Sequence, residues 1–293
     1  MKVSAPAKIN LFLHVTGRRS DGYHTLFTLM APVGLKDEIT IRIDASSGNI
    51  QVTCDHPLLP VDHSNLAFRA ASDFLRHRNH LPGARSQPGV NISIRKRIPV
   101  AAGLGGGSSD AAAVLLGMNR HFGEPFTQKE LMRMGLAIGA DVPFFLYGRP
   151  AIVTGIGEAL EPYPHRLPHH VLLVFPGIQV STAQVYKNLD LGLTNCEKKL
   201  KKLLLGQQAF DAALHACNDL ESYTLTMFPE IAAAKRALME VGAASALMSG
   251  SGSAVFGLFD SLSEARNARD HLRRHRQTWS VVLTELIGEP DHR

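Results

Sequence analysis

Cysteines and aromatic residues are scarce in this chain of 293 residues. The three cysteines, Cys54, Cys196 and Cys217, form no C-x-x-C pair and are odd in number. This pattern argues against a domain held together by disulfides, and we expect reduced thiols and a cytoplasmic protein. Aromatic residues make up only 6% of the chain, which is too few to predict a row of rings for stacking the bases of a single-stranded nucleic acid.

Long apolar runs and the spacings typical of metal sites are also missing. No apolar run approaches the ~20 residues that a membrane-spanning helix needs, so we expect no membrane partner. The first ten residues, MKVSAPAKIN, do not have the pattern of a signal or transit peptide. Neither His77-x-x-His80 nor His169-His170 is accompanied by further ligands at zinc spacing, and we predict no metal ion held by the protein.

The charge of the chain is moderate, with a formal net charge of +5. Basic residues gather at 198–202 and 273–276, each within a predicted helix, and such runs are usually solvated helix faces. A modest basic excess suits a small polyanionic ligand as well as it suits nucleic acid. We expect a small-molecule substrate, no nucleic-acid partner, and a monomer or a weak homodimer.

The hydrophobic pattern predicts an α+β fold with two domains, residues 1–161 and 162–293, because the composition changes over PYPHRLP at 162–168. In the first domain, strands are predicted over 9–16, 23–33, 38–43, 50–54 and 90–94, and a helix over 65–76. Thr127 and Glu130 have the spacing of a capping box, which predicts a helix from there to about Ile138.

The second domain is predicted to alternate strands and helices. The predicted strands are 171–175, 244–248, 253–259 and 281–286, and the predicted helices are 181–189, 197–205, 208–218, 229–241 and 262–275. This order of elements indicates a ferredoxin-like layer of helices on a sheet.

The glycine-rich stretch PVAAGLGGGSSDAAA at 99–113 organises the chain. Its four glycines lack Cβ atoms and allow a ligand close to the backbone, and the residues 108–110 that follow are good helix N-caps. With an alternating strand before it and an amphipathic helix after it, the stretch predicts a phosphate site at a helix N-terminus. A Walker A loop is excluded because no lysine follows Gly107, and a dinucleotide fingerprint is excluded by Ser108. The alternative is a turn that only joins strand to helix.

Two further motifs accompany this stretch: PAKINLFLHVTGRRSDGYH at 6–24 and LMSGSGSAVFG at 247–257. Together, and with NDLE at 218–221 and GADVPF at 139–144, they resemble the GHMP kinase family. Within the family they look like the branch that phosphorylates 4-diphosphocytidyl-2-C-methyl-D-erythritol in the non-mevalonate isoprenoid route. The resemblance runs from Pro6 to about Gly257. It implies an N-terminal domain like domain 2 of ribosomal protein S5, a ferredoxin-like C-terminal domain, and transfer of phosphate from MgATP to the 2-hydroxyl.

The resemblance also implies a role for individual residues. Asp141 would be the general base and Lys8 its partner, since a carboxylate accepts a hydroxyl proton and an ammonium balances phosphate charge. The residues implied for ATP are Pro99, Val100, Ala101, Ala102, Gly103, Leu104, Gly105, Gly106, Gly107, Ser108, Ser109 and Asn65. The residues implied for the substrate are Asn10, Tyr23, His24, Tyr186, Gly250 and Gly252, of which the tyrosines and His24 would hold the cytosine.

Other interpretations of these residues stay open at the level of sequence. By position alone, Lys8 would be a solvent-exposed lysine at a strand edge and Asp141 a capping or turn residue. A different GHMP kinase, acting on homoserine, mevalonate or a sugar, would share the phosphate loop without a cytosine pocket. A non-catalytic protein that binds nucleotides or nucleic acid would show binding without turnover, with a steep salt dependence if many phosphates were contacted.

Overall fold

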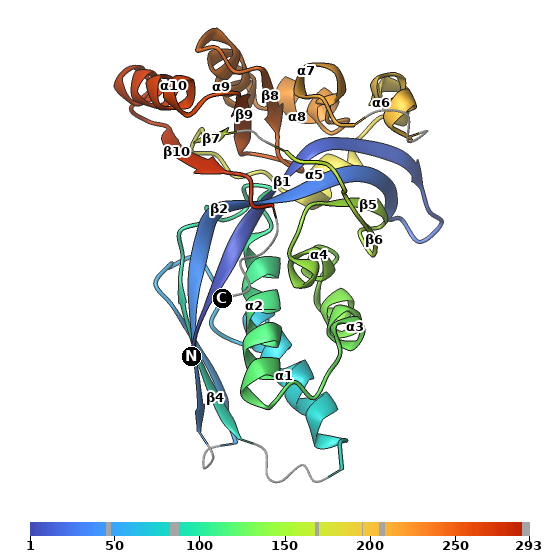
Figure 1. The fold of residues 1–293 in the computed structure, drawn as a ribbon, viewed down its shortest axis with the longest axis vertical. Coiled ribbons are helices and arrows are strands. Elements are labelled where there is room, and N and C mark those ends of the chain that lie inside the picture. The colour runs from blue at the N-terminus through green and yellow to red at the C-terminus, as the bar shows by residue number, and fades with distance from the viewer. Residues whose placement is uncertain (45–47, 83–87, 168–169, 195, 205–208, 289–293) are drawn as a thin grey trace. The chain divides into compact units, whose positions relative to one another are not determined.

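The computed structural model of the protein describes residues 1–44, 48–82, 88–167, 170–194, 196–204 and 209–288. The contacts divide the chain into two compact units, each built from several segments (Figure 1). The first unit contains Met1–Ala7, Leu35–Ile98 and Gly105–Gly148, and the second contains Lys8–Gly34, Pro99–Leu104 and Arg149–Arg293. The glycine-rich stretch therefore passes from one unit to the other between Leu104 and Gly105. The two consecutive domains with a boundary at residue 162 stay a prediction.

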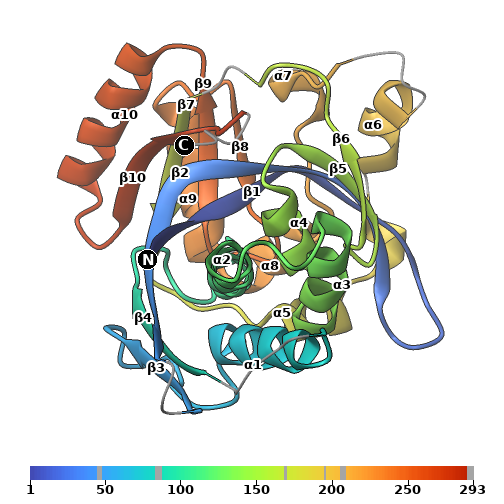
Figure 2. The ribbon, with the colours of Figure 1, turned by 60° about the horizontal axis from the view of Figure 1, so that its bottom comes forward.

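The first unit packs four helices beside three paired strands. β3 (Ile50–Cys54) lies parallel to β4 (Gly89–Arg95), and β4 pairs antiparallel with residues 38–44 of β2 (His24–Asp44). The helices are α1 (Leu66–Asn79), α2 (Gly106–His121), α3 (Gln128–Ile138) and α4 (Val142–Tyr147). Both views show α1 and α2 side by side (Figures 1 and 2). α1 buries one apolar face, whereas α2 is buried on all sides from Ser109 to Leu115, so the amphipathic pattern predicted for it is not observed. The capping box predicted at Thr127 is confirmed.

The second unit contains a four-stranded antiparallel sheet in the order β10 (Ser280–Glu285), β7 (His170–Phe175), β9 (Val255–Phe259) and β8 (Ser245–Met248). The helices α9 (Pro229–Glu240) and α10 (Leu262–His275) cover the apolar face of this sheet. The chain order strand, helix, strand, strand, helix, strand is that of a ferredoxin-like layer, as predicted.

The second unit also contains parts of β1 and β2 and several shorter elements. β1 (Lys2–Arg18) pairs with β2, while residues 26–30 of β2 pair with β5 (Ala151–Gly155), which in turn pairs with β6 (Ala159–Pro162). Short helices follow: α5 (Thr182–Lys187), a 3-10 turn (Leu191–Leu193), α6 (Cys196–Leu204), α7 (Ala212–His215) and α8 (Glu221–Met227). No helix in the described ranges is long and apolar enough to cross a membrane.

The structure corrects several predicted elements. The strands predicted over 23–33 and 38–43 form one long strand, β2, which begins at His24, because the chain crosses Gly34 and Leu35 without a turn. The helix predicted over 208–218 is reduced to the four residues of α7, and α8, β5 and β6 were not predicted. Parts of other predictions lie outside the described residues, namely His169 and positions 205 and 208.

The expectation of three reduced thiols is wrong. Cys196, at the start of α6, is joined by a disulfide to Cys217, whose Cα lies 5.7 Å from its own, and Cys54 is a free cysteine. The pair is separated by 21 positions and carries no local motif. Only the fold brings the two sulfur atoms together.

Candidate functional site

The first turn of α2 forms the part of the glycine-rich stretch that belongs to the first unit. Gly105 is the N-cap in the left-handed conformation (φ 69°), and no described side chain caps the helix. The prediction that residues 108–110 supply the N-cap is therefore wrong, because the helix already begins at Gly106. The hydroxyl of Ser109 is buried without a hydrogen-bond partner among the described residues. Uncapped N–H groups and a buried free hydroxyl at one helix N-terminus suit a phosphate group.

A buried ion cluster lies directly beneath this turn. Lys96 Nζ donates to Asp37 Oδ2 at 2.5 Å and to Asp110 Oδ2 at 2.8 Å, and its side chain is only 5% exposed. A Cβ on Gly106 would lie 3.3 Å from the same Nζ and 3.1 Å from Ile98 Cγ2, so a larger residue here would crowd the cluster. Burial raises the pKa of Asp110 to about 7, although Lys96 acts in the opposite direction. Sequence reasoning missed this cluster because Asp37 and Lys96 lie outside any motif and far from Asp110 in the chain.

Asp141 and Asn65 lie at two other helix starts in the same unit. Asp141 precedes α4 and is partly exposed, and a Cβ on nearby Gly139 would lie 3.6 Å from Ser108 Oγ at the start of α2. Asn65 caps α1, accepting from Ala67 N at 2.9 Å. The first residue of α1, Leu66, would contact a Cβ on Gly107 at 3.5 Å. The starts of α1, α2 and α4 thus lie close together.

Lys8 and Asn10 form the polar centre of the second unit. Lys8 Nζ donates to Asn10 Oδ1 at 2.6 Å, and Asn10 Nδ2 donates to Thr28 Oγ1 at 2.9 Å. The backbone N of Lys8 donates to Leu104 O at 3.0 Å, at the end of this unit's share of the glycine-rich stretch. Lys8 is 4% exposed, so it is not a lysine at a solvent-exposed strand edge. An ammonium that is buried in this way attracts an anion more strongly than one in bulk water.

The two glycine motifs meet beside this lysine. A Cβ on Gly103 (φ 74°) would clash with the carbonyl oxygen of Ser249, whose hydroxyl donates to Gly103 O at 3.0 Å. A Cβ on Gly250 (φ 55°) would lie 3.3 Å from Lys8 Nζ. Ala101 also has a positive φ of 53°, which is uncommon for a residue other than glycine and typical of functional loops. Two tightly packed backbone turns beside one cation form a site suited to an anion.

The second unit also contains an aromatic pair. The ring centroids of His24 and Tyr186 are 5.2 Å apart, and Tyr186 is on α5. Burial, with the nearby charge of Arg18, lowers the pKa of His24, so its imidazole is neutral at pH 7 and offers one donor and one acceptor. Tyr23 is 61% exposed. Thr182, also on α5, shares a 2.8 Å hydroxyl contact with Ser251 of the second glycine motif.

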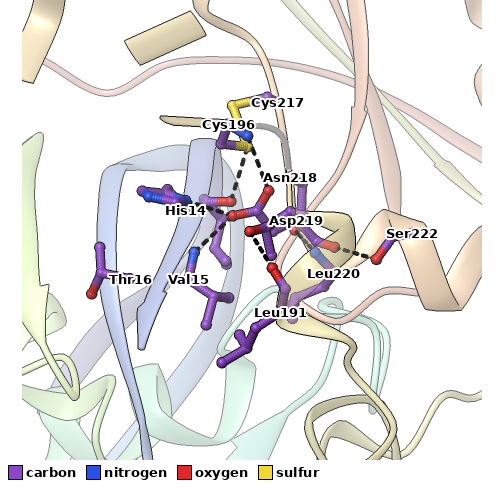
Figure 3. A network of polar contacts seen from close by, with 12 residues as sticks. His14, Val15, Thr16, Leu191, Cys196, Cys217, Asn218, Asp219, Leu220 and Ser222 are labelled. Atoms are coloured by element: carbon purple, nitrogen blue, oxygen red, sulfur yellow. Dashed lines mark hydrogen bonds and ion pairs between the residues drawn. A yellow bond between two sulfur atoms is a disulfide. The ribbon is translucent and has the colours of Figure 1, made fainter. Parts of the chain in front are cut away.

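Asp219 anchors a network that sequence reasoning did not find (Figure 3). Its Oδ2 accepts from His14 Nδ1 at 2.6 Å and from Val15 N at 2.9 Å, and its Oδ1 accepts from Cys196 N at 3.1 Å. His14 and Asp219 are 205 positions apart, so no local pattern indicates their pairing. The sequence did draw attention to Asp219 itself, because this residue stands in the NDLE motif at 218–221, but the motif does not indicate its partners.

The predicted site residues are thus divided between the units. Lys8, Asn10, Gly103 and Gly250 lie together in the second unit, where His24 and Tyr186 also meet. The first unit brings together the starts of the helices that carry Asn65, Gly105–Ser109 and Asp141. The partnership of Lys8 with Asp141 stays a prediction. Within the described residues, no group of three or more His, Cys, Asp or Glu side chains is placed to hold a metal ion.

Comparison with known proteins defines the class to which this fold and site belong. Residues 65–149 match the model of the GHMP kinases N terminal domain, and residues 198–277 match that of the GHMP kinases C terminal domain. The chain belongs to the GHMP kinase family.

The curated relatives show which members of this family the chain resembles. The 4-diphosphocytidyl-2-C-methyl-D-erythritol kinase of Syntrophotalea carbinolica is 44% identical, and the alignment covers 97% of this chain and 98% of the relative. The Pelobacter propionicus protein of the same name is 47% identical, and the alignment covers 98% of this chain and 99% of that relative. A crystal structure of 4-(cytidine 5'-diphospho)-2C-methyl-D-erythritol kinase superposes with a TM-score of 0.78 at 38% identity, covering 98% of this chain and 100% of the other. A homoserine kinase from Cytophaga hutchinsonii shares the fold at 18% identity and a TM-score of 0.75.

Proposed function

We propose that the protein transfers the γ-phosphoryl group of ATP to the 2-hydroxyl of 4-diphosphocytidyl-2-C-methyl-D-erythritol, giving the 2-phosphate and ADP in the non-mevalonate route to isoprenoids. The observation that carries the proposal is the meeting of two glycine turns at the buried ammonium of Lys8. Relatives that are named for this activity and match nearly the whole chain identify the substrate.

The residues present fit the phosphates of ATP. The uncapped start of α2 offers N–H groups, the buried hydroxyl of Ser109 lacks a partner among the described residues, and Gly106 leaves room where a Cβ would crowd Ile98 and Lys96. ATP supplies the phosphoryl group when bound. Mg²⁺ is expected to come with it, since this ion binds mainly through nucleotide phosphates and keeps few protein ligands.

Asp141 and Lys8 carry the proposed chemistry on the protein side. Phosphoryl transfer requires that the attacking hydroxyl lose its proton and that negative charge on the phosphate oxygens be stabilised. The carboxylate of Asp141 accepts that proton and, being partly exposed, returns it to solvent afterwards. The ammonium of Lys8, held by Asn10 Oδ1, supplies the positive charge.

The remaining residues select the substrate. The rings of His24 and Tyr186 lie together and, with the exposed ring of Tyr23, are assigned to the cytosine. The second glycine turn, with Gly250 and Gly252 both at positive φ, is assigned to the diphosphate. Asn10, on the same face of β1 as Lys8, is assigned to a hydroxyl of the substrate.

A panel of acceptors tests this proposal. The purified protein is incubated with MgATP and, separately, with 4-diphosphocytidyl-2-C-methyl-D-erythritol, homoserine, mevalonate and a hexose, while ADP and the phosphorylated product are measured. We expect ADP and a monophosphorylated product with the cytidylyl substrate alone. Turnover of another acceptor without turnover of this substrate would assign the chain to a different activity within the family, and nucleotide binding without any turnover would mean that it is not a kinase.

A further inference from the structure

The segment Cys217–Glu221, which follows α7 and includes the first residue of α8, is bound along strand β1. Leu13 N donates to Cys217 O at 2.8 Å and Asp219 N donates to Leu13 O at 2.9 Å, which makes a parallel bridge between Leu13 and Asn218. Asn218 and Asp219 are both buried. The segment therefore has a fixed position on the strand that carries Lys8 and Asn10.

The side chain of Asn218 reaches from this segment to the second glycine turn. Its Nδ2 donates two hydrogen bonds of 2.8 Å, to Met248 O and to Gly250 O, while its Oδ1 accepts from Leu220 N at 3.0 Å. Both amide protons are thus used to hold backbone carbonyls of the turn, and the oxygen fixes the amide against its own segment. No other residue type of the same size supplies two donors and an acceptor in this arrangement.

Glu221 holds Met248, the residue that precedes the same turn. Its Oε1 accepts from Met248 N at 2.9 Å, and its Oε2 forms a 2.6 Å ion pair with Lys235 on α9. The backbone N–H and C=O of Met248 are therefore both bound by side chains that lie three positions apart in one segment. This fixes the end of β8 from which the glycine turn departs.

The turn held in this way lies against Lys8. A Cβ on Gly250, whose carbonyl Asn218 binds, would lie 3.3 Å from Lys8 Nζ and 3.1 Å from the carbonyl oxygen of Gly103. Neither Asn218 nor Glu221 has a bond to Lys8 among the contacts described. Their effect on the ammonium would be exerted through the backbone that they hold.

We propose that Asn218 and Glu221 are positioning residues for phosphoryl transfer: they hold the turn Ser249–Gly252 at the place beside Lys8 where the substrate's diphosphate binds. The inference rests on the proposed function, because it takes the diphosphate as the ligand of this turn. It predicts that loss of these bonds weakens substrate binding far more than ATP binding.

Asn218→Asp is the sharpest variant, because it keeps the size and the acceptor while removing both donors and setting a carboxylate against two carbonyls. We expect the KM for the cytidylyl substrate, and the Kd for CDP as a probe, to rise about 10- to 100-fold, since buried carbonyls lose their partners. The KM for ATP should stay within about 2-fold. Ser222→Ala is the matched control: it removes the 2.8 Å bond to Asp219 O in the same region without touching the glycine turn, and should leave both KM values unchanged.

Glu221 provides an independent pair of variants in case Asn218→Asp does not fold. Glu221→Gln keeps an acceptor for Met248 N, so its KM for the cytidylyl substrate should stay near the wild-type value. Glu221→Ala removes the acceptor and should raise the KM for the cytidylyl substrate. Amide hydrogen exchange gives a readout that needs no activity, because Met248 N and Gly252 N are hydrogen-bonded in the wild type. Exchange over 248–252 should accelerate in Asn218→Asp and Glu221→Ala but not in Ser222→Ala.

These measurements separate the inference from the proposed function. Faster exchange over 248–252 together with a selective rise in the substrate KM supports the positioning role. Unchanged exchange and unchanged KM in folded Asn218→Asp and Glu221→Ala would overturn it, as would an equal rise in the KM for both substrates. A wild-type protein that is inactive on the cytidylyl substrate would instead refute the proposed function, and the exchange experiment would still decide whether these side chains hold the turn.

Discussion

The role proposed for Lys8 is argued from its burial. A lysine that is 4% exposed has lost most of its water, and its ammonium donates to the neutral amide oxygen Asn10 Oδ1. Attraction between opposite charges is stronger where water is excluded, so an anion that reaches this ammonium is held more firmly than at an exposed lysine. This is the physical reason to place the transferred phosphate or the substrate's diphosphate beside Lys8.

The proposed role of Asp141 as general base can be tested by substituting asparagine, which has the same shape. If its carboxylate accepts the proton of the substrate hydroxyl, the substitution Asp141→Asn should lower kcat by about 10²- to 10⁴-fold, because an amide cannot act as the base. The KM for ATP and the melting temperature should change little, since Asp141 makes no cap hydrogen bond to α4. The control is Asp211→Asn at the start of α7, where asparagine still caps the helix. A kcat for Asp141→Asn close to that of wild type would remove Asp141 from the mechanism.

The cytosine pocket is tested by competition between nucleotides. Stacking on Tyr23 and Tyr186 tolerates any base, so discrimination has to come from hydrogen bonds to the neutral imidazole of His24. We expect CDP to inhibit much better than UDP, His24→Ala to reduce this difference, and Tyr23→Ala to weaken both inhibitors. Inhibition constants at fixed ATP measure this. Equal inhibition by CDP and UDP in the wild type would refute the pocket.

At the scale of elements, the contact between the two glycine turns is the most demanding packing in the site. Gly103→Ala would require a left-handed alanine and would press its methyl group against Ser249 O. Gly242→Ala, in the same unit, has a similar positive φ of 91° but no neighbour within 4 Å. Gly242→Ala should lose about 1 kcal/mol of stability from the backbone alone, while Gly103→Ala should lose distinctly more and also reduce affinity for ATP and CDP. Urea unfolding and calorimetry measure the two effects, and equal losses in both variants would contradict a tight contact between the turns.

Elements with a strong local pattern could be predicted from the sequence. The capping box of α3, the helix at 262–275 and the strands of the ferredoxin-like layer depend on periodicity and caps within a few residues. The start of α2 could not be placed, because the serines at 108 and 109 are good caps in isolation and the left-handed Gly105 takes their place. Likewise Gly34 interrupts the pattern of β2 although the strand runs through it.

At the scale of the whole molecule, the chain passes repeatedly between two units, and each unit contains some of the predicted site residues. The residues that the motifs indicated, such as Lys8 and Gly103, lie in glycine-rich stretches or in short runs with a distinctive order of residues. The residues that were missed, among them His14 and Lys96, act through partners tens to hundreds of positions away. Contacts of that range arise from the packing of whole elements and have no local signature in the sequence.

Asp110 links the buried cluster under α2 to the stability of the whole protein. Burial raises its pKa to about 7 in the folded state, above its ordinary value of 3.8, so between these pH values the folded state binds more protons than the unfolded state. Stability attributable to this group is therefore lost as the pH rises from about 4 to about 7, by at most roughly 1.4 kcal/mol per pH unit, and does not change further above that window.

The Asp110→Asn variant should therefore gain stability relative to wild type as the pH is raised from 5 to 8, because it cannot ionise beside Asp37. The difference in the free energy of unfolding between the two proteins, from urea titrations at pH 5, 6, 7 and 8, cancels the titration of the histidines. Asp270→Asn is the control: its carboxylate is exposed and its pKa is lowered by Arg269, so its titration lies below this range and its difference from wild type should be constant. If the difference for Asp110→Asn were equally constant, the carboxylate under the glycine-rich turn would be ionised throughout, and Lys96 would outweigh the cost of burying it.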